Sequence, residues 1–197
     1  MSDTENPIDI SRFGRSIWES DESPSVQPAP SVPVRGNGIP VLCYHEIFRG
    51  SNTFQGFNVT PQAFEEQLKY LSTAGYRTVS LDDFFLAMKG EKPSNFPEKA
   101  ILLTFDDGFV SNYTEVAPLL RKYGFKGVLF LYPSIISSTR SLYMRWDKVR
   151  EIVKEGIFEP ASHTYWHPML PGMTREDIRF QLVKSKETLE KELGVTV

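Results

Sequence analysis

Two adjacent aspartates and two nearby histidines are the residues of this sequence whose types and spacing best suit chemistry. Asp106 and Asp107 follow an apolar run, and His163 and His167 are four residues apart, before Pro168 ends their segment. Two carboxylates so close at a partly buried strand end require a cation or a raised pKa, because like charges repel. Histidines at this spacing can meet on one side of a helical turn and share a metal. With one aspartate they would form a two-histidine, one-carboxylate site that keeps an open position for water.

Each of these patterns also has a purely structural interpretation. Asp-Gly after a strand is ordinary turn chemistry, and an aspartate before a helix is a common N-cap. A pair of histidines at helical spacing arises by accident on many helices, where each ring is only a surface or hydrogen-bonded group. Taken separately, the two patterns leave both interpretations open. Taken together, they favour a metal site.

The elements that must position these residues are strands and helices in alternation. From residue 39 onward, short apolar runs alternate with amphipathic segments, which predicts strand-helix units around a parallel sheet. The predicted strands are Pro40 to Tyr44, Tyr76 to Ser80, Ala100 to Phe105, Gly127 to Tyr132 and Ile157 to Ala161. In such folds the loops after the C-terminal ends of the strands gather on one rim and carry the reactive groups. The predicted rim therefore holds His45, Asp106, Asp107, His163 and His167.

The helices between the strands carry start and stop signals. Thr60 and Pro61 suit the N-cap and first turn of a helix that Gly75 ends. The last predicted helix lies between Thr174 and Gly194. Its apolar stripe, which should face a neighbouring element, consists of Ile178, Leu182 and Leu189.

Composition narrows the class of protein. The 197 residues carry a formal net charge of -3 with an isoelectric point near 5.7, so the basic surface that nucleic acid or anionic membrane attracts is not expected. Cys43 is the only cysteine, which excludes an internal disulfide and a thiolate zinc finger and favours a small buried residue in an apolar strand. No run of residues is apolar enough to span a bilayer, and the N-terminus shows no export signal.

Residues 1–38 differ from the rest of the chain. They are acidic, rich in Pro and Ser, and without helical or strand period, which predicts a disordered tail or linker. A short docking helix that contains Phe13, Ile17 and Trp18 is the alternative. Residues 39–197 are then expected to form one domain.

Two segments closely resemble the first two signature motifs of the NodB-like polysaccharide deacetylases, carbohydrate esterase family four. They are Leu103 to Gly108 (LTFDDG) and Ser162 to Pro168 (SHTYWHP). The resemblance covers residues 39–197 and implies an α/β fold, an incomplete (β/α) barrel with about five strand-helix units. In that family the first aspartate is the catalytic base and the second binds a divalent metal with the two histidines. This implies that Asp106 is the base and that the metal ligands are Asp107, His163 and His167. Zn²⁺ is the expected metal, with Co²⁺ or Ni²⁺ as alternatives.

The opening strand looks like a particular branch of the family. Val41 to Ile47 (VLCYHEI), with Phe57 to Pro61 after it, resembles the exopolysaccharide deacetylases that act on poly-N-acetylglucosamine. His45 would then bind substrate, tune the rim or serve as a hydrogen-bonded structural histidine. Three aromatic residues either stack on sugar rings or pack in the core, namely Tyr132, Tyr143 and Trp166.

The sequence departs from the family pattern at its C-terminal end. Family members continue into strands that supply an arginine beside the base, a pocket for the acetyl group and a Leu-x-His motif whose histidine is the acid. All three histidines of this chain are already placed, and nothing in the sequence puts His45 opposite the base. We therefore expect a C-terminally truncated chain whose last helix lacks a neighbour.

The resemblance implies a metal-dependent hydrolase that removes N-acetyl groups from an amino-sugar polysaccharide, acting on a carbon-nitrogen bond that is not a peptide bond. Its partner would be the substrate, an N-acetylated polysaccharide or oligosaccharide. We expect no nucleic-acid partner and no membrane-spanning segment in the chain. The alternative is a truncated, inactive remnant that binds carbohydrate or metal, and related folds also open cyclic amides or de-esterify plant polymers. The resemblance implies that the protein is located in the cell envelope or the extracellular space. If Met1 is the natural start of the protein, the missing export signal would instead imply a cytoplasmic location. The oligomeric state stays open.

Overall fold

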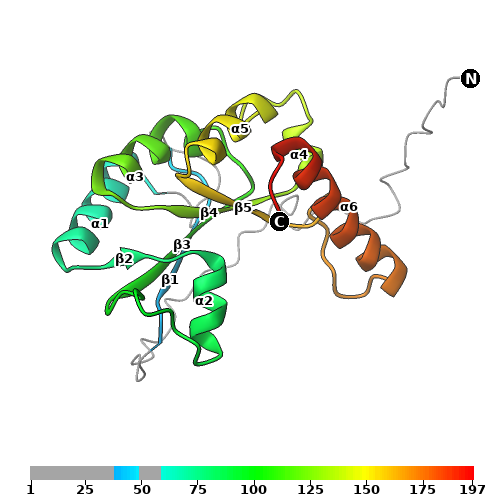
Figure 1. Ribbon diagram of the computed structural model, residues 1–197. Coiled ribbons are helices and arrows are strands. Elements are labelled where there is room, and N and C mark those ends of the chain that lie inside the picture. The colour runs from blue at the N-terminus through cyan, green and yellow to red at the C-terminus, as the bar shows by residue number, and fades with distance from the viewer. Residues whose placement is uncertain (1–37, 49–58) are drawn as a thin grey trace, which may run out of the picture.

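Strands and helices alternate along the chain (Figure 1). The computed structural model describes residues 38–48 and 59–197, so the predicted tail, apart from Gly38, and Phe57 and Asn58 lie outside the described residues. The strands are β1 Val41–Tyr44, β2 Arg77–Thr78, β3 Ala100–Asp106, β4 Gly127–Leu131 and β5 Phe158–Ser162. The helices are α1 Pro61–Thr73, α2 Leu81–Met88, the π-helix η3 Asn112–Val116, α3 Ala117–Tyr123, α4 Pro133–Ile136, α5 Trp146–Lys154 and α6 Arg175–Leu193. Each predicted strand is confirmed, with bounds that differ by at most two residues.

The strands form one parallel sheet, which confirms the predicted α/β class. Its order is β1-β3-β4-β5, and β2 pairs with the first two residues of β3. Tyr44 lies opposite Phe105 in the β1–β3 register, and Asp106 lies opposite Phe130 in the β3–β4 register. Within the described residues the sheet is open, as expected of an incomplete barrel, with β1 and β5 at its edges. Because all pairs are parallel, the C-terminal ends of the strands gather at one edge of the sheet.

The larger core lies between the sheet and the helices α1, α3 and α5, which cover one face (Figure 1). Leu103 and Phe105 of β3 are fully buried in it with Phe64 of α1. Side chains two residues apart on a strand share a face, which is why alternate residues of β3 enter this core. The cap of α1 is as predicted, since Thr60 Oγ1 accepts a hydrogen bond from the N–H of Ala63 at 3.2 Å.

The opposite face of the sheet carries a smaller apolar cluster. Leu102, Val128 and Ala161 are buried there, and Phe84 of α2 packs against them. Asp106 is four residues after Leu102 on the same strand, so the alternation places it on this face as well. The candidate catalytic residue therefore lies on the opposite side of the sheet from the larger core.

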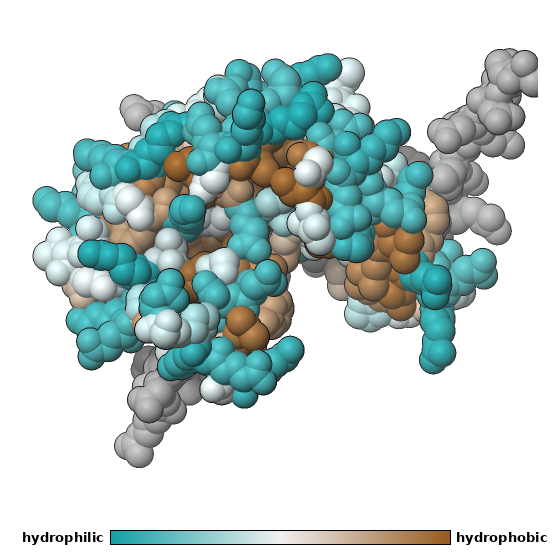
Figure 2. Space-filling view, in the orientation of Figure 1, coloured by the Kyte–Doolittle hydropathy of each residue, from teal (hydrophilic) through white to brown (hydrophobic). Residues whose placement is uncertain are grey.

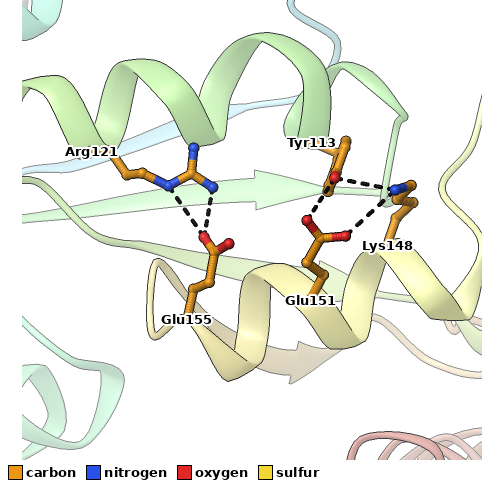
Figure 3. A network of polar contacts seen from close by, with 5 residues as sticks. All are labelled: Tyr113, Arg121, Lys148, Glu151 and Glu155. Carbon is orange, nitrogen blue, oxygen red and sulfur yellow. Dashed lines mark hydrogen bonds and ion pairs between the residues drawn. The ribbon is translucent and has the colours of Figure 1, made fainter.

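A polar network joins α5 to the η3–α3 segment (Figure 3). Arg121 donates from Nε and Nη2 to Glu155 Oε2 at 3.2 and 2.6 Å. Tyr113 Oη donates to Glu151 Oε1 at 2.8 Å, and Lys148 Nζ donates to Tyr113 Oη at 3.2 Å. Exposed contacts of this kind contribute little stability individually, but as a group they fix the position of α5. That helix leads directly into β5.

The last helix, α6, buries polar side chains together with an apolar one. Gln181, Ser185 and Leu189 are fully buried, whereas Leu182 is 48% exposed. The predicted apolar stripe is therefore wrong at Leu182, because the side of α6 that meets the protein carries hydrogen-bonding groups. Figure 2 shows an apolar patch over α6, where the exposed residues are Phe180, Leu182 and Val183. None of the helices in the described ranges combines the length and apolarity needed to cross a membrane.

Candidate functional site

Asp106 ends β3, and Asp107 begins the tight turn that follows. Asp107 has a φ of +71°, a left-handed conformation that aspartate tolerates better than most residues. Gly108 follows with a φ of +75°, and a Cβ atom there would lie 2.7 Å from side-chain carbons of both Leu131 and Ile136. Only glycine fits this position without displacing the core. Because of the turn, the two adjacent carboxylates have different neighbours.

The loop after β5 carries both histidines, and it is not the helical turn that their spacing predicts. The N–H of His163 donates to Leu131 O at 2.8 Å, which extends the pairing of β5 with β4. Thr164 and His167 have φ values of +67° and +60°, and Thr164 Oγ1 accepts from the N–H of His167 at 3.0 Å. This chain reversal brings the two imidazole rings to a centroid separation of 4.5 Å.

A buried glutamine of α6 holds the histidine loop. Gln181 Oε1 accepts hydrogen bonds from the N–H groups of Tyr165 at 3.0 Å and Trp166 at 2.9 Å. One turn later, Ser185 Oγ accepts from Ser162 Oγ at 2.7 Å. Sequence reasoning missed both α6 residues, because polar positions on an amphipathic helix normally face water. Their four-residue spacing is the only signal of a shared face.

Asp107, His163 and His167 converge on one point. Asp107 Oδ1 lies 3.7 Å from His163 Nε2 and 3.8 Å from His167 Nε2, and within the described part of the chain this buried oxygen has no hydrogen-bond partner. Tetrahedral bonds of about 2.0–2.2 Å would place neighbouring ligand atoms roughly 3.3–3.5 Å apart. The observed separations exceed a hydrogen bond and approach this value. The three side chains therefore fit a divalent cation with two nitrogen ligands and one oxygen ligand.

The surroundings of His167 favour its neutral imidazole, the form that binds metal. Burial lowers the pKa of His167, and the neighbouring His163 lowers it further. The ring of Tyr132 stacks on His167 with a centroid separation of 5.2 Å and an interplanar angle of 27°. Tyr132 therefore orients a candidate metal ligand.

Asp106 lies beside this set and has a different environment. Its Oδ2 is 4.0 Å from His163 Nε2 and also 4.0 Å from His45 Nε2. Burial raises the pKa of Asp106 above its usual range, while the charges of His163 and His45 oppose that rise. A carboxylate with an elevated pKa that is not needed as a metal ligand is suited to accept a proton.

His45 and Cys43 reach the site from the end of β1; the sequence predicted His45 at this rim but not Cys43. The parallel register sets Tyr44 beside Phe105, so the residues that follow, His45 and Asp106, are also neighbours. Cys43 is exposed, which shows that its predicted burial is wrong, because strand alternation turns Tyr44 into the core and Cys43 to the other face. Cys43 Sγ donates to Asp106 Oδ2 at 3.6 Å.

The three aromatic residues near the rim pack mainly against other rings. Tyr143 stacks on Phe109 with centroids 5.0 Å apart, and Trp166 packs against Phe180 at 5.2 Å. Tyr132 contacts His167, as described above. All three are partly buried.

Comparison with known proteins identifies relatives of this fold and site. Residues 94–197 match the family profile described as polysaccharide deacetylase. The chain is 31% identical over 153 residues to YxkH of Bacillus subtilis, whose name assigns it to the polysaccharide deacetylases, with 77% of this chain and 51% of that protein covered. It is also 31% identical over 142 residues to the poly-beta-1,6-N-acetyl-D-glucosamine N-deacetylase of Escherichia coli K12, covering 66% of this chain and 21% of that protein. The chain thus spans about half of the first relative and about a fifth of the second.

Solved structures with the same fold include two at 26% and 27% identity. The deacetylase PplD of Streptococcus pyogenes, solved with acetate, superposes with a TM-score of 0.73 at 26% identity, covering 81% of this chain and 70% of that one. IcaB of Ammonifex degensii superposes with a TM-score of 0.70 at 27% identity, covering 83% of this chain and 72% of that one.

Proposed function

Because this chain belongs to the polysaccharide deacetylase family, we propose that it hydrolyses the N-acetyl groups of an amino-sugar polysaccharide with the aid of a divalent cation. The observation that carries the proposal is the buried Asp107 Oδ1, which lies within 4 Å of two imidazole nitrogens and has no hydrogen-bond partner in residues 38–48 and 59–197. A buried carboxylate oxygen without a partner is costly unless a cation binds it. Asp107, His163 and His167 would hold that cation.

We propose poly-N-acetylglucosamine or its oligomers as the substrate class. Support comes from the Escherichia coli relative, whose name states action on the β-1,6-linked polymer. The VLCYHEI segment at β1 supports the same branch, since it resembles the exopolysaccharide deacetylases.

The mixed nitrogen and oxygen ligands favour Zn²⁺, and Co²⁺ or Ni²⁺ suit the same donors. When bound, such a cation would polarise the amide carbonyl and lower the pKa of a bound water to about 7. The protein supplies the positions of the three ligands and their supports. Gln181 fixes the loop between the two histidines, and Tyr132 stacks on the second of them.

Asp106 accepts the proton from the attacking water. Its carboxylate also contacts His45 and Cys43, and burial raises the pKa of Asp106 toward the range of an effective base. A general base of this kind contributes about 10²–10⁴-fold to the rate.

His45 donates a proton to the departing amine. The leaving nitrogen needs an acid, and His45 Nε2 is 4.0 Å from Asp106 Oδ2, the same distance as His163 Nε2. The acid and the base therefore stand on the same rim, contributed by the ends of two paired strands. This role was not expected from the sequence alone, which places no residue opposite Asp106.

The test is acetate release from a β-1,6-linked N-acetylglucosamine oligomer by the chain before and after zinc loading. We expect acetate only from the loaded protein, and a β-1,4-linked oligomer run in parallel defines the linkage preference. If the loaded chain binds the oligomer and releases no acetate, it is a carbohydrate-binding protein and the proposal fails.

A further inference from the structure

A second cluster of potential metal ligands lies on the β1 side of Asp106. Cys43, His45 and Asp106 each offer one ligand atom, and these atoms lie within 4.8 Å of one another. Cys43 and His45 are two residues apart at the end of β1, so they project on the same side of the chain. The β1–β3 register then brings both against the end of β3, where Asp106 is located.

The spacing of these atoms suits a tetrahedral ion. Cys43 Sγ is 3.6 Å from Asp106 Oδ2, and His45 Nε2 is 4.0 Å from the same oxygen. Bonds of about 2.3 Å to sulfur and about 2.0–2.1 Å to nitrogen and oxygen would place neighbouring ligand atoms roughly 3.3–3.6 Å apart. Small side-chain rotations would bring the three atoms to that separation. Cys43 is exposed, and His45 and Asp106 are only partly buried, so an ion can reach them from solvent.

We propose that Cys43, His45 and Asp106 form a second metal site, distinct from the site of Asp107, His163 and His167. One thiolate, one imidazole and one carboxylate select a thiophilic divalent ion such as Zn²⁺ or Cd²⁺ over Mg²⁺ or Ca²⁺. The two sites border each other, because His163 Nε2 is 3.7 Å from Asp107 Oδ1 and 4.0 Å from Asp106 Oδ2.

An ion at this second site would bind Asp106 and His45, which we propose as the general base and the general acid of deacetylation. Excess zinc should therefore inhibit acetate release, and Cys43→Ser should weaken that inhibition. This consequence rests on the proposed function. The existence of the site does not, and its test uses no substrate.

The test is a cobalt titration of the metal-free chain followed by absorption spectroscopy. Cys43 is the only cysteine, so a thiolate-to-cobalt charge-transfer band in the near ultraviolet can arise from no other residue. We expect this band in the wild type and its loss in Cys43→Ser. The double variant His163→Ala/His167→Ala should keep the band, because it removes only ligands of the first site. Circular dichroism of each variant verifies that the fold is retained.

Two results would overturn the proposal. A wild-type protein with no thiolate band in excess cobalt has no cysteine-bound ion. A band that disappears in the folded double variant would assign Cys43 to the first site. The cobalt spectra do not depend on deacetylase activity. The second metal site can therefore be confirmed or refuted whether or not the protein deacetylates a polysaccharide.

Discussion

Asp107 Oδ1 lies 3.7 Å from His163 Nε2, yet this buried oxygen accepts no hydrogen bond from any residue that the structure describes. The distance is too long for a hydrogen bond and short enough for both atoms to bind one ion. Adjacent to it in sequence, Asp106 lies 4.0 Å from the same His163 nitrogen but also contacts Cys43 and His45 of the β1 end. The paired aspartates therefore share one neighbour and differ in the others, and this difference underlies the assignment of one to the metal and the other to proton transfer.

Replacing Asp107 should weaken metal binding at the site of Asp107, His163 and His167. We expect Asp107→Asn to lower zinc affinity by at least about 100-fold, because a neutral amide replaces the only carboxylate among the three ligands. Isothermal titration calorimetry on the metal-free protein measures the change. Asp82→Asn is the matched control, since Asp82 is an exposed aspartate of α2. Wild-type affinity in Asp107→Asn would rule out this carboxylate as a ligand.

Gln181 should matter for both stability and metal affinity. In Gln181→Met, the partly buried N–H groups of Tyr165 and Trp166 lose their acceptor, and each unpaired group costs about 1–3 kcal/mol when water does not reach it. We expect the free energy of unfolding, measured with urea, to fall by about 2 kcal/mol or more. Zinc affinity should fall about 10–100-fold, the effect expected when a residue that orients metal ligands is removed. Leu182→Gln, at an exposed neighbouring position, should change stability by less than about 0.5 kcal/mol. An equal effect of both substitutions would refute the anchoring role.

Gly108 should tolerate alanine far less well than Gly124. Both have positive φ, +75° and +69°, but a Cβ at Gly108 would meet two core carbons at 2.7 Å, whereas nothing lies within 4 Å at Gly124. We expect Gly124→Ala to cost about 1 kcal/mol and Gly108→Ala about 2–4 kcal/mol, because overpacking adds to the backbone strain. Urea unfolding of both variants measures the difference. Similar costs would mean that the Leu131 and Ile136 side chains move aside freely.

Much of the fold was predictable, because the strands and helix ends depend on local patterns. Thr60 and Gly194 stand where a cap and a stop were predicted, and the five strands follow from short apolar runs. The close approach of His45 to Asp106 was not predictable, because it depends on the register between two strands far apart in sequence. The helical turn predicted for His163 and His167 was wrong, since two residues with positive φ reverse the chain between them. Four-residue spacing alone cannot distinguish these geometries.

Alkaline stability should depend on Tyr44. Burial raises the pKa of its phenol from 10.0 to about 12, so the unfolded state releases this proton before the folded state does. The resulting stabilisation is complete below about pH 10 and is lost as pH rises through about 12, at about 1.4 kcal/mol per pH unit.

We therefore expect the wild type to be more stable than Tyr44→Phe near neutral pH, because the neutral Tyr44 Oη donates a hydrogen bond to Gln67 Oε1 at 2.8 Å. The advantage should shrink steadily above about pH 10. Urea unfolding across this range measures it, with Tyr70→Phe as a control because Tyr70 is 69% exposed. A stability difference that does not change with pH would contradict the burial of a neutral phenol.

The central claim is that Asp107 holds the cation while Asp106 moves the proton. It is tested most directly by the rate of acetate release from an N-acetylglucosamine oligomer by Asp106→Asn and wild type, compared at equal zinc content. We predict that Asp106→Asn keeps zinc at the site of Asp107, His163 and His167 and releases acetate about 10²–10⁴-fold more slowly, as expected when a general base is lost. A variant that hydrolyses the oligomer at the wild-type rate would contradict the assignment.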